Sequence, residues 1–157
     1  MKFETGLGEL IGRGGIYHAM PGNSVQETLE CIIAKIPLPK TITPQMLLKA
    51  MLEREALMST GVGSGIAIPH PRNPLISEAA EQFVALAYLE KPLDWRALDG
   101  KPVDTLFILV SATAKFHLQT LSALTYLCRQ DEFLGLLGKK VSGETLIQYI
   151  NETEEKW

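Results

Sequence analysis

Residues 105–110 read TLFILV and form the strongest strand signal in the sequence. After the threonine the run is wholly apolar, which is typical of a strand that is covered on both faces. Residues 83–89 predict a second buried strand, and residues 66–68 and 16–20 predict two short ones. A sheet built from such strands needs apolar cover on both sides.

Helices supply this cover, because helical signals alternate with the strands along the chain. Ser24 followed by Glu27 predicts a capped helix over residues 24–36, and Pro44 predicts the first residue of a helix that ends near residue 58. Strands that alternate with helices predict an α/β domain with helices on both faces of one sheet. Further helices are predicted over residues 116–128, with Leu118, Leu121, Leu124 and Leu127 at helical spacing, over residues 133–137 as an extension or restart, and over residues 143–151 after Ser142.

Composition places the chain among ordinary folded domains. It has 157 residues, 46% hydrophobic and 21% charged, with a net charge of −3. This balance lacks the basic excess that nucleic-acid binding needs, so we expect no nucleic-acid partner. The Gly-rich residues 1–15 predict a loosely held arm, and residues 16–157 predict a single domain.

The sequence also predicts where the protein resides. No apolar run is long enough for an export signal or a membrane span, so we expect a soluble cytoplasmic protein with no direct membrane insertion. Cys31 and Cys128 stand far apart and in no metal-binding spacing, which fits a reducing compartment.

The glycines at positions 61, 63 and 65 suggest a nucleotide loop, but the order of elements argues against it. The loop follows a helix and leads into a strand, whereas phosphate-binding loops run from a strand into a helix. We therefore interpret residues 61–65 as a helix terminator before a strand.

His70 follows the predicted strand at residues 66–68 and stands between Pro69 and Pro71. Ligands of layered α/β domains bind at strand ends, and the two prolines stiffen the histidine for such a role. The alternative is a loop histidine without function, because one histidine alone is weak evidence.

Two more residues point to an anion. Arg54 falls within the apolar sector of its predicted helix, where it either reaches a site or extends to solvent. His117 lies near the start of the helix over residues 116–128, where backbone N–H groups favour an anion. Two histidines, an arginine and a helix N-terminus suit a phosphoryl group. A zinc site that adds Glu55 stays open, although the spacing matches no known zinc motif.

The same residues carry a resemblance to a known family. Residues 52–70, LEREALMSTGVGSGIAIPH, resemble the active-site signature of the type 2 enzyme IIA domain of the bacterial phosphoenolpyruvate-dependent sugar phosphotransferase system, which includes fructose, mannitol and nitrogen-regulatory members. Residues 98–110, LDGKPVDTLFILV, and residues 117–121, HLQTL, are also similar to this family. The resemblance covers about residues 16–150.

The resemblance implies a three-layer α/β/α sandwich around one mixed sheet. It also implies that His70 accepts a phosphoryl group from the histidine-containing phosphocarrier protein and passes it to a cysteine of an enzyme IIB partner. His117 and Arg54 match the other catalytic positions, and neither a metal nor another cofactor is implied.

Four further residues lie within or next to this signature. We expect Glu55, Gly65 and Pro69 to support the phosphoryl site, with Glu55 or another acceptor holding the far nitrogen of a histidine. Pro71 departs from the family, which usually has glycine, alanine or cysteine there; proline removes an N–H beside the site.

Three functions therefore remain open. The first is a phosphocarrier enzyme IIA, and the second is a nitrogen-type regulatory module whose phosphorylation state controls protein partners without sugar transport. The third is a metal-dependent hydrolase that uses His70, His117 and Glu55.

Overall fold

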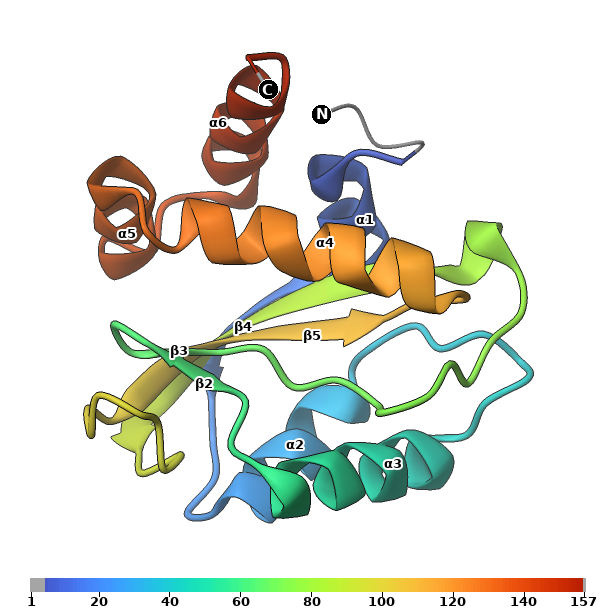
Figure 1. Cartoon of the computed structure of the whole chain (residues 1–157). Coiled ribbons are helices and arrows are strands. Elements are labelled where there is room, and N and C mark those ends of the chain that lie inside the picture. Colours follow the sequence, from blue (N-terminus) through green and yellow to red (C-terminus); the bar gives the residue numbers. More distant parts are fainter. Residues whose placement is uncertain (1–4, 157) are drawn as a thin grey trace.

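One mixed five-stranded sheet forms the centre of the computed structural model, which describes residues 5–156 (Figure 1). Across the sheet the strands lie in the order β1 (Ile16–Met20), β4 (Phe83–Leu93), β5 (Val103–Val110), β3 (Ile66–Ala67) and β2 (Gly61–Gly63). β4 is antiparallel to β5, β1 runs parallel to β4, β3 runs parallel to β5, and β2 is antiparallel to β3.

Helices cover both faces of the sheet. α2 and α3 lie on one face, and α1, α4, α5 and α6 lie on the other (Figure 1). This is the predicted three-layer α/β/α sandwich, so the fold class is confirmed. The helices are α1 (Leu7–Gly14), α2 (Val25–Ile33), α3 (Pro44–Leu57), the short 3₁₀ helix η1 (Ala79–Glu81), α4 (Ala114–Leu127), α5 (Asp131–Gly138) and α6 (Gly143–Glu154).

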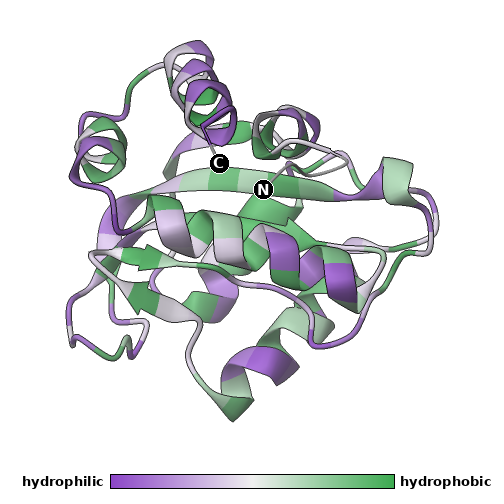
Figure 2. Ribbon diagram, turned by 45° about the horizontal axis from the view of Figure 1, so that its top comes forward, coloured by the Kyte–Doolittle hydropathy of each residue, from purple (hydrophilic) through white to green (hydrophobic). Residues whose placement is uncertain are grey.

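The two buried central strands divide their side chains between two cores. On β4, Ala85 and Ala87 pack with α2 and α3, whereas Val84 and Leu86 pack on the opposite face. This alternation follows from the two-residue period of a strand. Figure 2 shows the result: the sheet is coloured mainly hydrophobic, and hydrophilic residues gather on the surrounding helices and loops.

The predicted helix starts are confirmed by their caps. Ser24 Oγ accepts a hydrogen bond from Glu27 N at 3.1 Å, and the Glu27 carboxylate accepts one from Asn23 N at 2.9 Å. Thr43 caps α3 in the same way, with Pro44 as the first helical residue. These local bonds satisfy N–H groups that a helix cannot pair internally.

The loosely held arm predicted for residues 1–15 is wrong over residues 7–14, which form α1. Leu10 and Ile11 are buried against the sheet, and Leu7 N donates to Glu154 Oε1 at 2.8 Å. A Cβ at Gly14 would lie 2.2 Å from Val84 O, so the glycine permits close contact between α1 and β4. Residues 1–4 lie outside the described part of the chain.

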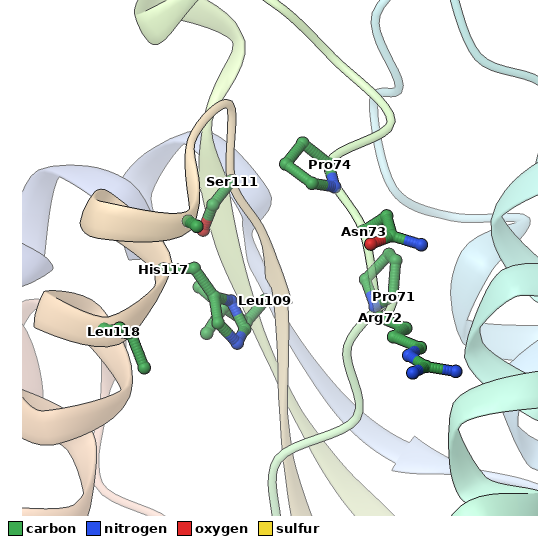
Figure 3. A pocket seen from close by; sticks show the side chains of 9 residues that line it. Pro71, Arg72, Asn73, Pro74, Leu109, Ser111, His117 and Leu118 are labelled. Carbon is green, nitrogen blue, oxygen red and sulfur yellow. The ribbon is translucent and has the colours of Figure 1, made fainter.

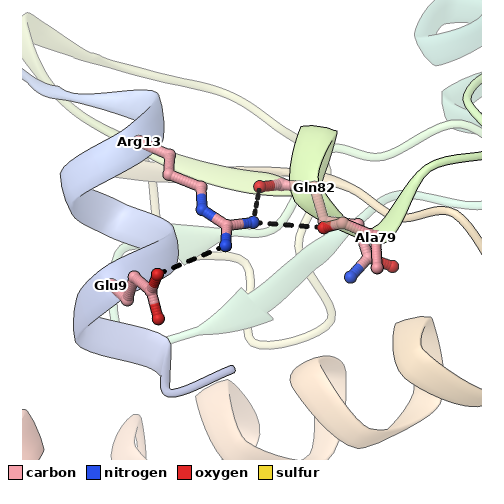
Figure 4. A network of polar contacts seen from close by, with 4 residues as sticks. All are labelled: Glu9, Arg13, Ala79 and Gln82. Carbon is pink, nitrogen blue, oxygen red and sulfur yellow. Dashed lines mark hydrogen bonds and ion pairs between the residues drawn. The ribbon is translucent and has the colours of Figure 1, made fainter. Parts of the chain in front are cut away.

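Arg13 of α1 connects this helix to the beginning of β4 (Figure 4). Its guanidinium donates to the carbonyls of Ala79 and Gln82 at 3.2 and 3.0 Å, and it forms an ion pair with Glu9 at 3.3 Å. The Gln82 side chain accepts a bond from Ala112 N at 2.8 Å. This chain of contacts fixes the segment that leads from β5 into α4.

Within residues 5–156, no helix combines the length and the apolar character that crossing a membrane requires.

Candidate functional site

The candidate site begins at His70, which lies three residues beyond the end of β3. Beyond Ala67 the chain stays paired, because Ile68 N donates to Thr60 O at 3.0 Å and Pro69 O accepts from Leu109 N at 3.0 Å. His70 is therefore held at the carboxyl end of β3, beside the carboxyl end of the parallel strand β5. Strand ends of this kind are where α/β domains place their ligands.

The orientation of the His70 ring determines which nitrogen is reactive. Nδ1 lies 2.7 Å from Ile68 O, and because a carbonyl can only accept, Nδ1 carries the proton. Nε2 then keeps its lone pair. Burial is the main reason why the pKa of His70 lies below its usual range, and the charge of Arg54 lowers this pKa further. His70 is 8% exposed, and its ring is neutral at pH 7.

His117 stands next to His70 from the first turns of α4. The two ring centroids are 4.7 Å apart, with the ring planes inclined by 49°. Desolvation, followed by the charges of His70 and Arg54, lowers the pKa of His117 to about 4. Two imidazoles that are both neutral at pH 7 therefore share the site. A neutral imidazole keeps the lone pair that a nucleophile needs to attack a phosphoryl group.

Arg54 provides the positive charge at this site. It lies in the last turn of α3, and its Nη1 donates to Met58 O at 2.7 Å. That bond anchors the guanidinium at the helix C-terminus, where a cation is favoured. Its charge lowers the pKa of both His70 and His117, so the structure brings the three sequence-predicted residues together.

The sequence analysis allowed either Glu55 or another acceptor to hold a histidine ring, and the hydrogen bonds of Glu55 go to other residues. Its carboxylate accepts hydrogen bonds from Thr60 N at 3.2 Å, from Thr60 Oγ1, and from Trp95 Nε1 at 3.2 Å. The acceptor that holds the His70 ring is instead the Ile68 carbonyl, a backbone group that the sequence analysis missed. Glu55 therefore joins α3 to the strand that leads to His70.

Gly65 and Pro69, which the sequence analysis expected to support the site, lie at opposite ends of β3. Gly65 has φ +80° and follows Ser64 at φ 56°, so these residues form the turn between β2 and β3. The stretch over residues 61–65 thus forms a hairpin, and the prediction that it ends the preceding helix is wrong, because α3 already ends at Leu57 with Met58 as its C-cap. Pro69 is buried and paired with β5 next to His70, whereas Gly65 lies at the far end of β3.

A pocket of about 220 Å³ opens beside His117 (Figure 3). Pro71 and the following loop line one side of it, and α4 lines the other with His117 and Leu118. Leu118 was predicted to belong to the apolar stripe of α4, but its side chain is 62% exposed at this pocket. Ser111, which the sequence analysis did not place in a site, also lines the pocket. Its only sequence signal is its position between the strongest strand and α4.

The described residues do not contain the cluster of ligands that the metal-dependent hydrolase hypothesis requires. Over residues 5–156 no group of three or more histidine, cysteine or acidic side chains is placed to hold a metal ion. Glu55, the third ligand of the hydrolase hypothesis, is bound to Thr60 and Trp95 instead.

Comparison with known families gives a match over residues 10–153. The matching family is described as "Phosphoenolpyruvate-dependent sugar phosphotransferase system, EIIA 2". A nitrogen regulatory protein of Pseudomonas aeruginosa is 33% identical over 152 residues, which are 94% of this chain and 96% of that protein. A fructose-specific EIIA component of Haloferax volcanii is 36% identical over 110 residues, covering 69% and 70% of the two chains.

Solved structures agree with these sequence matches. The nitrogen regulatory protein IIA-Ntr of Neisseria meningitidis superposes with a TM-score of 0.79 at 28% identity, covering 91% of this chain and 97% of that one. The mannitol enzyme IIA of Escherichia coli, solved in complex with phosphorylated enzyme IIB, has the same fold, with a TM-score of 0.66 at 14% identity over 87% and 94% of the two chains.

Proposed function

Because this chain belongs to the type 2 enzyme IIA family of the phosphoenolpyruvate-dependent sugar phosphotransferase system and is a phosphotransferase domain, we propose that His70 Nε2 is the atom that carries the phosphoryl group. The observation that carries this proposal is the bond from His70 Nδ1 to Ile68 O at 2.7 Å, which leaves Nε2 as the free nucleophile.

The reaction is an in-line transfer between two nitrogens. The Nε2 lone pair forms a bond to phosphorus while the bond between phosphorus and the donor's histidine breaks, and that electron pair stays on the donor nitrogen. Arg54 neutralises charge on the equatorial oxygens, and His117 donates a hydrogen bond to one of them. The protein contributes position and electrostatics, and the transfer proceeds without a metal or nucleotide.

The donor in this proposal is the histidine-containing phosphocarrier protein. Enzyme IIA domains pass phosphate to enzyme IIB partners, and the Escherichia coli mannitol complex contains a phosphorylated enzyme IIB. We therefore assign a cysteine of an enzyme IIB domain as the next acceptor, with the bond between Nε2 and phosphorus breaking as the sulfur–phosphorus bond forms. A cytoplasmic location follows from these partners and stays a prediction.

A second use of the same chemistry is a regulatory signal. The similarity to a nitrogen regulatory protein extends over 94% of this chain, which favours a form whose phosphorylation state controls a protein partner. Transfer of the phosphoryl group from the purified phosphorylated protein to an enzyme IIB domain from the same organism distinguishes the two uses. Rapid transfer supports the sugar pathway, and a stable phosphorylated protein supports regulation.

The acceptor assignment is tested by intact mass after incubation with phosphoenolpyruvate, enzyme I and the phosphocarrier protein. We expect one acid-labile phosphoryl adduct on the wild-type protein and none on His70→Ala. His18→Ala is the matched control, because His18 is an exposed histidine on β1 and should leave the adduct unchanged. An adduct that persists in folded His70→Ala, or its absence from the folded wild-type protein, would contradict the proposal.

A further inference from the structure

The pocket beside His117 lies between α4 and the loop that follows His70. Ser111 and Ala114, the first residue of α4, line it together with His117. The loop side combines Pro71 and Pro74 with the polar residues Arg72 and Asn73. Figure 3 shows the Ser111 hydroxyl directed toward the side of the pocket where the His117 ring lies. With a volume of about 220 Å³, this space fits a small molecule.

The hydroxyl of Ser111 is the buried polar group that this pocket adjoins. The residue is 6% exposed, and Oγ has no hydrogen-bond partner among residues 5–156. Leaving a buried hydroxyl unpaired costs about 1–3 kcal/mol. Thr28 and Tyr88 also have buried hydroxyls without a partner in residues 5–156, but Ser111 is the one of the three that lines this pocket, so its hydroxyl is available to a ligand there.

The N-terminus of α4 adds further donors on the same side of the pocket. Phe116 N is capped by Thr113 Oγ1 at 3.1 Å, but within the described chain no acceptor is recorded for the backbone N–H groups of Ala114 and Lys115. The first turn contains no acidic residue. This 14-residue helix therefore presents a positive N-terminal end near Ser111, which the Thr113 cap compensates only at Phe116 N.

The donors are also held rigidly before any ligand arrives. Gln82 binds Ala112 N at 2.8 Å, and Arg13 holds the Gln82 carbonyl at 3.0 Å, so the segment between β5 and α4 is fixed from two sides. A rigid group of donors loses little freedom when it binds a ligand.

We propose that this pocket binds a small organic oxyanion, with its carboxylate or phosphate group on Ser111 Oγ and the first turn of α4 and its short apolar part against Pro71 and Pro74. Since His117 lines the pocket and also faces His70, the bound molecule is an effector of phosphoryl acceptance. It places negative charge beside the residue that receives the incoming phosphoryl group and therefore slows the transfer. This role goes beyond the proposed function, and binding itself does not depend on it.

The test is a titration of the ¹⁵N-labelled, unphosphorylated full chain with acetate, butyrate and inorganic phosphate at constant ionic strength, followed by NMR. We expect saturable shifts of the amides of residues 111–115 and of the His117 ring. Butyrate should bind more tightly than acetate because of Pro71 and Pro74. Phosphate binding tighter than that of either carboxylate would identify a phosphate-bearing ligand, and the reverse order a carboxylate.

Ser111→Ala should weaken binding about tenfold or more, as expected for the loss of a hydrogen bond to a charged group. Ser122→Ala, the same change at an exposed position of α4, should bind as the wild type does. Thermal unfolding of both variants establishes that each is folded. The absence of saturable shifts, or equal affinity in folded Ser111→Ala, would overturn the site.

Two further measurements separate this inference from the phosphoryl assignment. Folded His70→Ala should bind butyrate with unchanged affinity, so the pocket is tested even if His70 is not the acceptor. Butyrate should slow phosphoryl acceptance by the wild-type protein and have little effect on Ser111→Ala. Binding without any change in the wild-type rate would overturn the effector role.

Discussion

Replacing Glu55 by alanine tests whether this residue acts as a structural link or as a partner of the histidine ring. The substitution removes the acceptor of Trp95 Nε1–H and of the Thr60 hydroxyl, and these residues are 2% and 5% exposed. Each buried donor left unpaired costs about 1–3 kcal/mol, so the free energy of unfolding should fall by about 2–6 kcal/mol. Urea denaturation followed by fluorescence measures this change.

Glu53→Ala is the matched control, because Glu53 is exposed on the same helix and should change stability by no more than about 0.5 kcal/mol. Under conditions where Glu55→Ala is folded, it should accept phosphate at close to the wild-type rate, since Ile68 O and not Glu55 holds the His70 ring. A folded Glu55→Ala variant that is as stable as Glu53→Ala, or one that no longer accepts phosphate, would refute this reasoning.

Four other predictions concern the site and its reaction. Arg54→Ala should lower the single-turnover rate of phosphoryl acceptance by about 10²-fold without a comparable loss of stability, because one donor to the transferred group is removed; an equal rate would contradict its role. As the pH falls, half of the rate should be lost only below pH 6.5, because the pKa values of His70 and His117 both lie below the usual histidine value; half-loss at or above pH 6.5 would contradict this. The free energy of unfolding should carry the full contribution of neutral His117 above pH 6.5 and lose it progressively toward pH 4, because the histidine takes up its proton at a higher pH in the unfolded chain than in the folded one. Urea denaturation at several pH values measures this change. A His117→Asn variant with the same pH slope as the wild type would contradict it. Pro71→Gly should accept phosphate several-fold faster than wild type, because it restores an N–H beside His70; Pro74→Gly is its control, and an unchanged or slower rate would show that Pro71 does not limit transfer.

Local sequence signals predicted most of the fold correctly. Ser24 and Pro44 mark the starts of α2 and α3 in the sequence because a helix N-terminus is determined by short-range interactions. Tertiary contacts decided the elements that sequence reasoning missed. Helix α1 contains several glycines and has poor intrinsic helix propensity, but its packing against β4 uses the absence of a side chain at Gly14.

The residues of the candidate site divide in the same way between those with local sequence signals and those placed by tertiary contacts. His70, His117 and Arg54 were predicted because strand ends and helix ends are visible in the sequence. The partners of Glu55 were not predictable, because helical spacing does not show which residues of another segment will face a side chain. Trp95, which binds Glu55, lies 40 positions away in the sequence. Ser111 gave no signal by itself, since only the packing of the loop after His70 creates the pocket that it lines.

The most direct test of the account is to identify the phosphorylated nitrogen. Long-range ¹H–¹⁵N NMR of the phosphorylated protein, labelled in histidine, distinguishes the two ring nitrogens of each imidazole. We predict that the phosphoryl group is on Nε2 of His70 and that Nδ1 remains protonated toward Ile68 O. Phosphorylation of His70 Nδ1, or of His117 in place of His70, would contradict the account.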